Sequence, residues 1–185
     1  STSVTSFYFN KKFKKKHNHF IIHLNNSIDL IYNDVRKFGF VKVLDSQNLS
    51  INHHISRLGP EPLSKKFNFT YLKSKIIKCK KNAKNFMMDQ SYISGLGNIY
   101  VNEILFLSSI DPRKLTYDLS NEEVEKIVFF TKKTLNDSIK LGGSSIRDFN
   151  GISGEDGNFQ QKFMVYDRDN KFCRKCKTEE KITNK

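Results

Sequence analysis

The 185-residue chain has few cysteines and no long apolar run, and each scarcity excludes a class of protein. Its three cysteines are the isolated Cys79 and the pair Cys173 and Cys176. They do not resemble a disulfide framework, so we expect a reducing compartment. No apolar stretch approaches the ~20 residues that a membrane-spanning helix needs. The first residues also lack the charged-then-apolar order of a secretory signal, so the sequence predicts no membrane partner.

Acidic residues are scarce relative to basic ones. Lys and Arg number 32 against 19 Asp and Glu, which gives a formal net charge of +13. Such a chain favours a polyanionic partner, nucleic acid first and an anionic membrane second. A solvated lysine surface encoded by an AT-rich genome would have the same composition, so charge alone leaves both interpretations open. Hydrophobic residues make up 37% of the chain, which supports a folded core.

Proline is absent before Pro60, and the character of the sequence changes there. Residues up to about 45 have the pattern of strands. Within them, "HFIIHL" (19–24) and "DLIY" (29–32) flank a polar turn and predict a hairpin. The motif "LGPEPLS" (58–64) indicates a boundary, and the periodicity after it is helical.

The first helical stretch covers residues 71–86. It places Leu72, Ile76 and Cys79 on one face and lysines on the other. Near the end of the chain, "NFQQKFMVYDR" (158–168) has the pattern of a strand, and the cysteine pair follows it. We therefore expect strands, then helices, then a small element with two cysteines.

The clearest helix follows Ser120. Ser120 and Glu123 have the spacing of a capping box, and Gly142 is the expected C-terminal stop. An apolar stripe with a helical period lies between them. Its members are Val124, Ile127, Val128, Thr131, Leu135 and Ile139.

The turn "SGLGN" (94–98) directly precedes an apolar helix. Gly95 and Gly97 permit positive φ and the close approach of a backbone to a ligand. The helix start offers backbone N–H groups and the positive end of a dipole, and a phosphate fits there. Asn98 would add a side-chain donor. The local pattern by itself favours a tight turn in which Asn98 is only the N-cap.

Several motifs occur in one order along nearly the whole chain. They are "HNHFIIHL…YNDVRKFGF", "RLGPEPLS", "MMDQSYISGLGNIYVNEILFLSSIDP", "GGSSIRDF…GEDGNFQQKFMVYDR" and "CRKC". Together they resemble the formamidopyrimidine-DNA glycosylase family. The resemblance implies an α+β fold with a partial N-terminal β-sandwich domain in residues 1–58. It further implies a helix-two-turn-helix DNA-binding domain in 59–150. A lesion-capping loop and a truncated zinc-finger hairpin would occupy 151–185.

The resemblance also assigns DNA-binding roles to particular residues. Asn98 is similar to the Asn that clamps the phosphate backbone beside the lesion, and Lys84 to a lysine that helps to hold the same strand. Lys80 lies in the same basic stretch, and His17 resembles a DNA-contacting histidine. Cys79 interrupts the family's run of lysines beside Lys80. Without the resemblance, Lys84 would be read as a solvated helix-face lysine and His17 as a surface histidine.

Arg36 and Phe38 match the family residues that read the DNA. The resemblance implies that Arg36 contacts the base left without its partner and that Phe38 wedges into the base stack. The alternative is a solvated hairpin charge and an ordinary core Phe. Val35 and Lys37 replace the family's Pro and second Arg, and Lys lacks the planar fork of Arg.

Cys173 and Cys176 have the spacing of zinc ligands. The resemblance implies one zinc ion in the complete family protein. A redox pair has the same spacing, and structural zinc usually takes four ligands. The chain ends at Lys185 without a second such pair, so we expect an incomplete finger.

The resemblance places the family's nucleophile on the α-amine of an N-terminal Pro followed by Glu. This chain begins Ser1-Thr2-Ser3, and we expect no catalytic residue in it. We expect the natural protein to be an enzyme, and this chain to be a fragment that binds DNA without catalysis.

The implied function is a DNA glycosylase with abasic-site lyase activity in base excision repair. Its implied substrates are oxidised purines, 8-oxoguanine and formamidopyrimidines, in damaged double-stranded DNA. We expect a monomer in the bacterial cytoplasm, associated with the nucleoid. The alternative, from another class, is a non-catalytic nucleic-acid-binding helix-two-turn-helix module.

Overall fold

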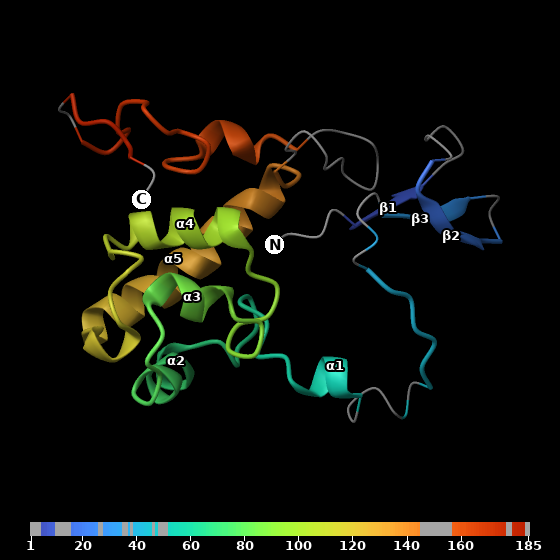
Figure 1. Cartoon of the computed structure of the whole chain (residues 1–185), viewed down its shortest axis with the longest axis horizontal. Helices are drawn as coiled ribbons and strands as arrows, with labels where there is room; N and C mark the ends of the chain where they lie inside the picture. Colours follow the sequence, from blue (N-terminus) through green and yellow to red (C-terminus); the bar gives the residue numbers. More distant parts are fainter. Residues whose placement is uncertain are drawn as a thin grey trace. The chain divides into compact units, whose positions relative to one another are not determined.

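The computed structural model describes residues 5–9, 16–25, 28–34, 37, 39–45, 47, 52–144, 157–176 and 179–183. Helices and a small antiparallel sheet together make the α+β fold that the sequence predicts (Figure 1). The chain divides into two compact units. The first comprises Ser1–Val43 and Ser138–Lys162, and the second comprises Leu44–Asp137 and Phe163–Lys185. The division into domains predicted from the sequence stays a prediction.

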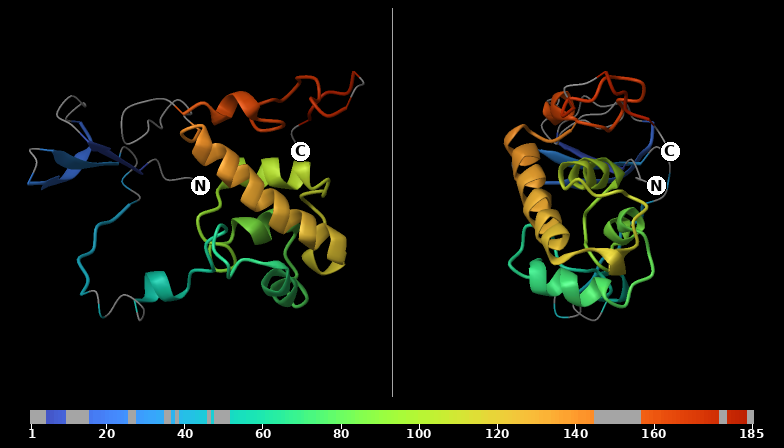
Figure 2. Two further views of the ribbon diagram at one scale, coloured as in Figure 1. Left: turned by 180° about the vertical axis from the view of Figure 1, so that it is seen from behind. Right: turned by 90° about the vertical axis from the view of Figure 1, so that its left-hand side faces the viewer.

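The first unit contains a three-stranded antiparallel sheet in the order β1-β3-β2 (Figure 2). The strands are β1 (Thr5–Phe9), β2 (Asn18–His23) and β3 (Asp29–Asp34). The predicted hairpin is confirmed, because β2 pairs with β3 in register from Phe20 to His23. Residues 39–45 form no strand, which corrects the prediction of strands up to about residue 45.

The second unit is helical. Its α-helices are α1 (His53–Ser56), α2 (Phe69–Ile76), α3 (Ala83–Met88), α4 (Asn98–Leu107) and most of α5 (Asn121–Lys140). A 3-10 helix, Thr116–Asp118, precedes α5. A further 3-10 helix, Phe159–Lys162, belongs to the first unit.

The predicted helix over residues 71–86 is wrong as one element. The chain leaves α2 after Ile76 and starts α3 at the N-cap Asn82, whose side chain accepts from the Asn85 N–H at 2.8 Å. Between the helices, the Thr116 hydroxyl donates to the carbonyl of Cys79 at 2.8 Å. This segment therefore gives its carbonyls to a partner distant in sequence instead of to a continuous helix.

The core of the second unit joins α2, α3, α4 and the first half of α5. Its apolar side chains are withdrawn from water, which is the main favourable term for folding. They include Phe67, Leu72, Ile76, Cys79, Phe86, Met87, Ile93, Leu96, Val101, Ile104, Leu105 and Val124. The expected apolar face of residues 71–86 is thus buried even though the helix is broken.

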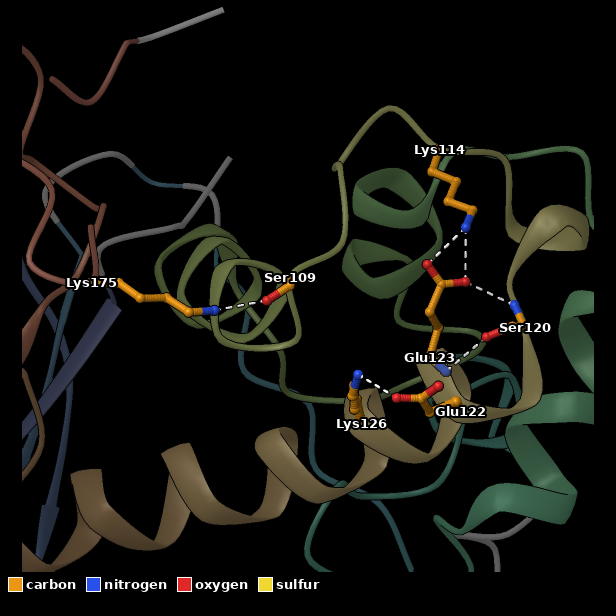
Figure 3. A network of polar contacts seen from close by, with 7 residues as sticks. All are labelled: Ser109, Lys114, Ser120, Glu122, Glu123, Lys126 and Lys175. Atoms are coloured by element: carbon orange, nitrogen blue, oxygen red, sulfur yellow. Dashed lines mark hydrogen bonds and ion pairs between the residues drawn. The ribbon is translucent and has the colours of Figure 1, made fainter. Parts of the chain in front are cut away.

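The capping box at the start of α5 is confirmed (Figure 3). The Ser120 N–H donates to Glu123 Oε2 at 2.8 Å, and the Glu123 N–H donates to Ser120 Oγ at 3.2 Å. Lys114 Nζ adds a bond to Glu123 Oε1 at 2.7 Å. Gly142, with φ 75°, ends the helix as predicted.

The buried stripe of α5 follows the prediction over its first turns only. Val124, Ile127 and Thr131 are buried, whereas Ile139 is 64% exposed. The buried positions continue instead through Thr134 and Ser138, which continue the spacing of three and four residues after Thr131.

The predicted strand over residues 158–168 is wrong. The segment forms a 3-10 helix over Phe159–Lys162 and then a series of turns. The backbone N–H groups of Met164, Val165 and Tyr166 all donate to the carboxylate of Glu103 on α4. Consecutive N–H groups that converge on one side chain cannot point alternately to two neighbouring strands, as a ladder requires.

The end of the chain forms a small hairpin, with an antiparallel bridge between Phe172 and Lys181. The Cys173 N–H donates to the Glu180 carbonyl at 2.9 Å. A hairpin is expected there, and its identity as part of a zinc finger stays a prediction. Of the helices in the described part of the chain, none combines the length and apolar character that a bilayer crossing requires.

Candidate nucleic-acid interface

A groove of about 690 Å³ lies within the second unit, between helices α3 and α4 and the segment that follows Phe163. Lys84 of α3 and Asn98 and Asn102 of α4 line it, together with Arg113 and Arg168. The groove therefore brings together Lys84 and Asn98, two predicted DNA-binding residues that are fourteen positions apart in the sequence.

The turn before α4 sets where the helix begins and so where Asn98 lies in the groove. Gly95 has φ 82°, a conformation that disfavours any side chain, so the expectation of positive φ is confirmed there. Gly97, with φ −111°, is the N-cap of α4 and makes no side-chain capping bond. Asn98 is the first helical residue, so the alternative in which Asn98 is the N-cap is wrong. The first turn of α4 therefore has no hydrogen bond from an N-cap side chain.

Asn98 has an oriented side chain. Its Oδ1 accepts a hydrogen bond from Nδ2 of Asn102 at 3.2 Å, one turn further along α4. The Nδ2 group of Asn98 is thereby the part of the amide that could donate to a ligand. Asn98 and Asn102 are both partly buried, and both line the groove.

The charges that line the groove are mixed. Lys84, Arg113 and Arg168 face it, but so do three acidic residues, Asp111, Asp167 and Asp169. Arg113 pairs with Asp111 at 2.7 Å. Arg168 donates from Nε to the Met164 carbonyl at 3.1 Å and from a terminal nitrogen to the Phe172 carbonyl at 2.8 Å.

Both arginines are thus engaged in the structure itself. The side chain of Lys84, by contrast, has no hydrogen-bond or ion-pair partner among the residues described. Lys84 is therefore the lining cation best placed to meet a ligand's negative charge.

Glu103 joins the two walls of the groove. It lies on α4, is only 2% exposed, and accepts from the N–H groups of Met164 at 2.7 Å, Val165 at 2.9 Å and Tyr166 at 2.8 Å. Hydrogen bonds to a carboxylate are stronger than those between neutral groups. They fix the segment that carries Tyr166 and Arg168 against the helix that carries Asn98.

A second polar cluster supports the loop that leads to the Gly95 turn. Asp89 accepts from the Lys81 ammonium, and its Oδ1 accepts from the N–H and hydroxyl of Ser91 at 2.9 and 2.7 Å. The hydrogen bond from Lys81, with those from Ser91, lowers the pKa of Asp89 to about 2. Lys81 also lies over the ring of Tyr92 at 5.4 Å.

The other predicted DNA-binding residues are not in this groove. Lys80 is exposed and lines a separate hollow with Ile77 and Tyr117. His17 belongs to the first unit, where its carbonyl accepts from the Asp34 N–H at 3.0 Å.

Arg36 and Phe38 lie outside the described residues. Reasoning from the sequence missed Asn102, Arg113 and Arg168. Only Asn102 had a local signal, since it stands four residues after Asn98 on a helix.

The two terminal cysteines lie together on the hairpin. The Cys176 N–H donates to Cys173 Sγ at 3.3 Å. Backbone N–H groups lower the pKa of the Cys173 thiol, and the hydrogen bond with Cys173 raises the pKa of Cys176 to about 11. Across the described ranges, no group of three or more His, Cys, Asp or Glu side chains could hold a metal ion. Two thiols are fewer than the four ligands that a structural zinc site usually takes, so the expected zinc ion stays a prediction.

Known proteins resemble this chain in sequence. The family model described as "Formamidopyrimidine-DNA glycosylase H2TH domain" matches residues 58–150. Formamidopyrimidine-DNA glycosylase from Histophilus somni (strain 2336) is 45% identical over 163 residues, which cover 88% of this chain and 60% of that protein. Formamidopyrimidine-DNA glycosylase from Oceanobacillus iheyensis is 40% identical over 162 residues, which cover 88% of this chain and 58% of that protein.

Solved structures agree with the sequence relatives. The crystal structure of the MutM (Fpg) protein from Thermus thermophilus superposes with a TM-score of 0.83 at 27% identity, over 97% of this chain and 66% of that one. Wild-type Lactococcus lactis Fpg in complex with an N7-benzyl-Fapy-dG containing DNA superposes with a TM-score of 0.84 at 31% identity. The match covers 95% of this chain and 64% of that one. The chain spans about three fifths of the length of the curated relatives above. The match over residues 58–150 and these likenesses place it in the formamidopyrimidine-DNA glycosylase family.

Proposed function

We propose that this chain is the DNA-binding part of a base excision repair glycosylase and that its groove holds the backbone of damaged duplex DNA. The observation that carries the proposal is the meeting of Lys84 and Asn98 in one groove, at a helix start that lacks a side-chain cap. Relatives whose structures contain damaged DNA support it, among them a Lactococcus lactis Fpg mutant bound to a THF-containing DNA.

The groove has three kinds of group that suit a phosphate. The first turn of α4 presents backbone N–H groups and the positive end of the helix dipole. The Asn98 amide adds a neutral donor, and the Lys84 ammonium adds a charge. Phosphate contacts of this kind fix the position of a protein on DNA without reading its sequence.

We further propose that the complete protein removes oxidised purines, 8-oxoguanine and formamidopyrimidines, and cleaves the resulting abasic site. Solved relatives bound to Fapy-dG containing DNA support this substrate class. The resemblance assigns the role of nucleophile to none of these 185 residues. We therefore expect the polypeptide by itself to bind damaged DNA without excising a base.

Cys173 and Cys176 would hold a zinc ion through two thiolates, and zinc would give the hairpin a structural cross-link.

The alternative function is a non-catalytic nucleic-acid-binding module. A Pro-Glu start in the complete reading frame would favour the enzyme over this module.

The test is a fluorescence anisotropy titration of an abasic-analogue duplex and an intact duplex, over a series of salt concentrations. Affinity for the abasic duplex should fall with salt, with a log–log slope of ~−0.9 per phosphate neutralised. Asn98→Ala should weaken binding by about 1–3 kcal/mol because it leaves a partner unsatisfied. Its effect should leave the salt slope unchanged, since the amide is neutral.

Lys84→Ala should instead reduce the magnitude of the slope by ~0.9. Asn136→Ala and Lys133→Ala, at exposed positions of α5, are the matched controls and should bind like the parent chain. Unchanged affinity in a folded Asn98→Ala protein would refute the proposed groove.

A further inference from the structure

We propose that Gln90 is a positioning residue that holds the glycine turn before α4 in the shape in which Asn98 meets a DNA phosphate. The inference rests on the proposed function and deepens it, since it concerns the same groove. Gln90 does not line the groove. The Gln90 side chain forms hydrogen bonds with the backbone of the turn that leads into the groove.

The side chain of Gln90 makes hydrogen bonds with both ends of its amide. Its Oε1 accepts from the N–H of Gly95 at 2.7 Å, and its Nε2 donates to the carbonyl of Leu96 at 2.9 Å. The same Nε2 donates to the carbonyl of Met88, at the end of α3, at 3.2 Å. One amide thus links α3 to the two residues that immediately precede the N-cap Gly97.

The turn needs such a support. A glycine at φ 82° has no side chain to restrict it, and glycine loses more conformational freedom on ordering than any other residue. The N-cap Gly97 adds no side-chain bond of its own. A Cβ at Gly95 would meet nothing within 4 Å, so no neighbouring group packs against that residue, although Leu96 beside it is buried in the core. Among the described side chains, Gln90 is the one that bonds to both Gly95 and Leu96.

The backbone of residue 90 is itself anchored. Its carbonyl accepts from the Gly59 N–H at 2.8 Å. A Cβ at Gly59 would lie 2.3 Å from backbone atoms of Tyr92, so the loop and the 58–60 segment pack in direct contact. Gln90 therefore connects a fixed loop to the backbone N–H of Gly95, the position in the turn against which nothing packs.

This arrangement makes a specific prediction about coupling. If Gln90 acts through Asn98, then Gln90→Ala should lose affinity for an abasic-analogue duplex by about three- to tenfold, the range expected for one neutral hydrogen bond. In the Asn98→Ala background the same change should have little further effect, because two residues that act on one contact are not additive. Asn98 is neutral, so the salt slope should be the same for all four proteins.

The experiment is a double-mutant cycle of Gln90→Ala and Asn98→Ala, measured by anisotropy on the 185-residue chain. Gln90→Asn keeps both ends of the amide and should recover part of the loss, whereas Gln90→Glu loses the donor and should not. Asn136→Ala, at an exposed position of α5, is a matched control outside the groove. Thermal unfolding of each variant, and amide exchange of Gly95, report on the fold and the turn separately.

The outcomes separate the two proposals. If the parent chain does not bind the abasic duplex, or Asn98→Ala binds like the parent, the proposed function fails. If Asn98→Ala weakens binding and Gln90→Ala either has no effect or adds fully to it, the inference about Gln90 is wrong and the groove stands. Faster Gly95 exchange, a non-additive cycle and an unchanged unfolding temperature would support it.

Discussion

Replacement of Glu103 by Gln is the sharpest test of how the groove is built. The carboxylate is 2% exposed and accepts three backbone N–H groups. An amide keeps one oxygen, which can take the place of Oε1 and still accept from Val165 and Tyr166. The amide nitrogen then takes the place of Oε2 and faces the Met164 N–H. The Met164 N–H loses its acceptor, and the amide NH2, itself a donor, is placed against it.

The magnitude follows from these contacts. An unsatisfied buried donor costs about 1–3 kcal/mol, and the remaining two bonds lose the strengthening that a charge gives. Because Met164, Val165 and Tyr166 are themselves only partly buried, water can replace some of the loss. We therefore expect Glu103→Gln to lower the free energy of unfolding by about 2–3 kcal/mol, and Glu103→Ala by about 3–5 kcal/mol.

The assay is urea denaturation, with amide exchange of residues 164–166 as a local readout. Glu122→Gln is the matched control, because Glu122 is exposed and pairs with Lys126 one turn along α5 at 2.6 Å (Figure 3). Such a surface pair contributes about 0.3–0.5 kcal/mol. A Glu103→Gln protein as stable as Glu122→Gln, with residues 164–166 still protected from exchange, would refute the reasoning.

Three further predictions concern pH, metal and catalysis. Lys81 holds the pKa of Asp89 at about 2, below its ordinary 3.8, so the ionised carboxylate stabilises the fold above that ordinary value. Asp89→Asn should therefore be less stable than the parent at pH 7 in urea titrations, and the difference should vanish as the pH falls from 3.8 toward 2. The purified chain should lose zinc to a mild chelator, because Cys173 and Cys176 supply two of four ligands; stoichiometric zinc after chelation, measured by atomic absorption, would contradict this. In borohydride trapping on an abasic duplex, the chain should form no covalent adduct above background, because an ordinary lysine with pKa ~10.4 has little free base at neutral pH. Trapping at the rate of a family member that starts with Pro-Glu would overturn that expectation.

Local signals in the sequence predicted local structure well. The capping box of α5 involves residues three positions apart, and Gly142 ends the helix through its own backbone conformation. The hairpin of β2 and β3 also depends on neighbouring segments. A short sequence pattern can predict these interactions, because the residues involved are close together in the chain.

Two of the failures come from contacts between distant segments. Thr116 takes carbonyls that would have continued α2, and no local pattern marks that break. Glu103 gathers the N–H groups of a segment some sixty residues away and turns an expected strand into loops. Ile139 has the right residue type for the stripe, but the helical phase leaves it exposed.

The candidate site was predicted in part for the same reason. Asn98 stands in a distinctive turn, and its motif placed it before α4, while Lys84 was assigned through the order of the motifs. Arg113 and Arg168 could not be foreseen, because the fold alone brings their segments to the groove. The hydrogen bonds of the Gln90 amide could not be predicted from the sequence either, because its partners are backbone atoms.

The most direct test of the proposed groove is to map where DNA binds. Amide NMR spectra of the ¹⁵N-labelled chain should be recorded while a duplex with a central abasic analogue is added, with an intact duplex as the comparison. The account predicts that the largest shifts occur at Gly97, Asn98 and Ile99, and in α3 around Lys84, and that they are stronger with the abasic duplex. Shifts confined to the lysines of α5, or equal for both duplexes and absent from the start of α4, would contradict it.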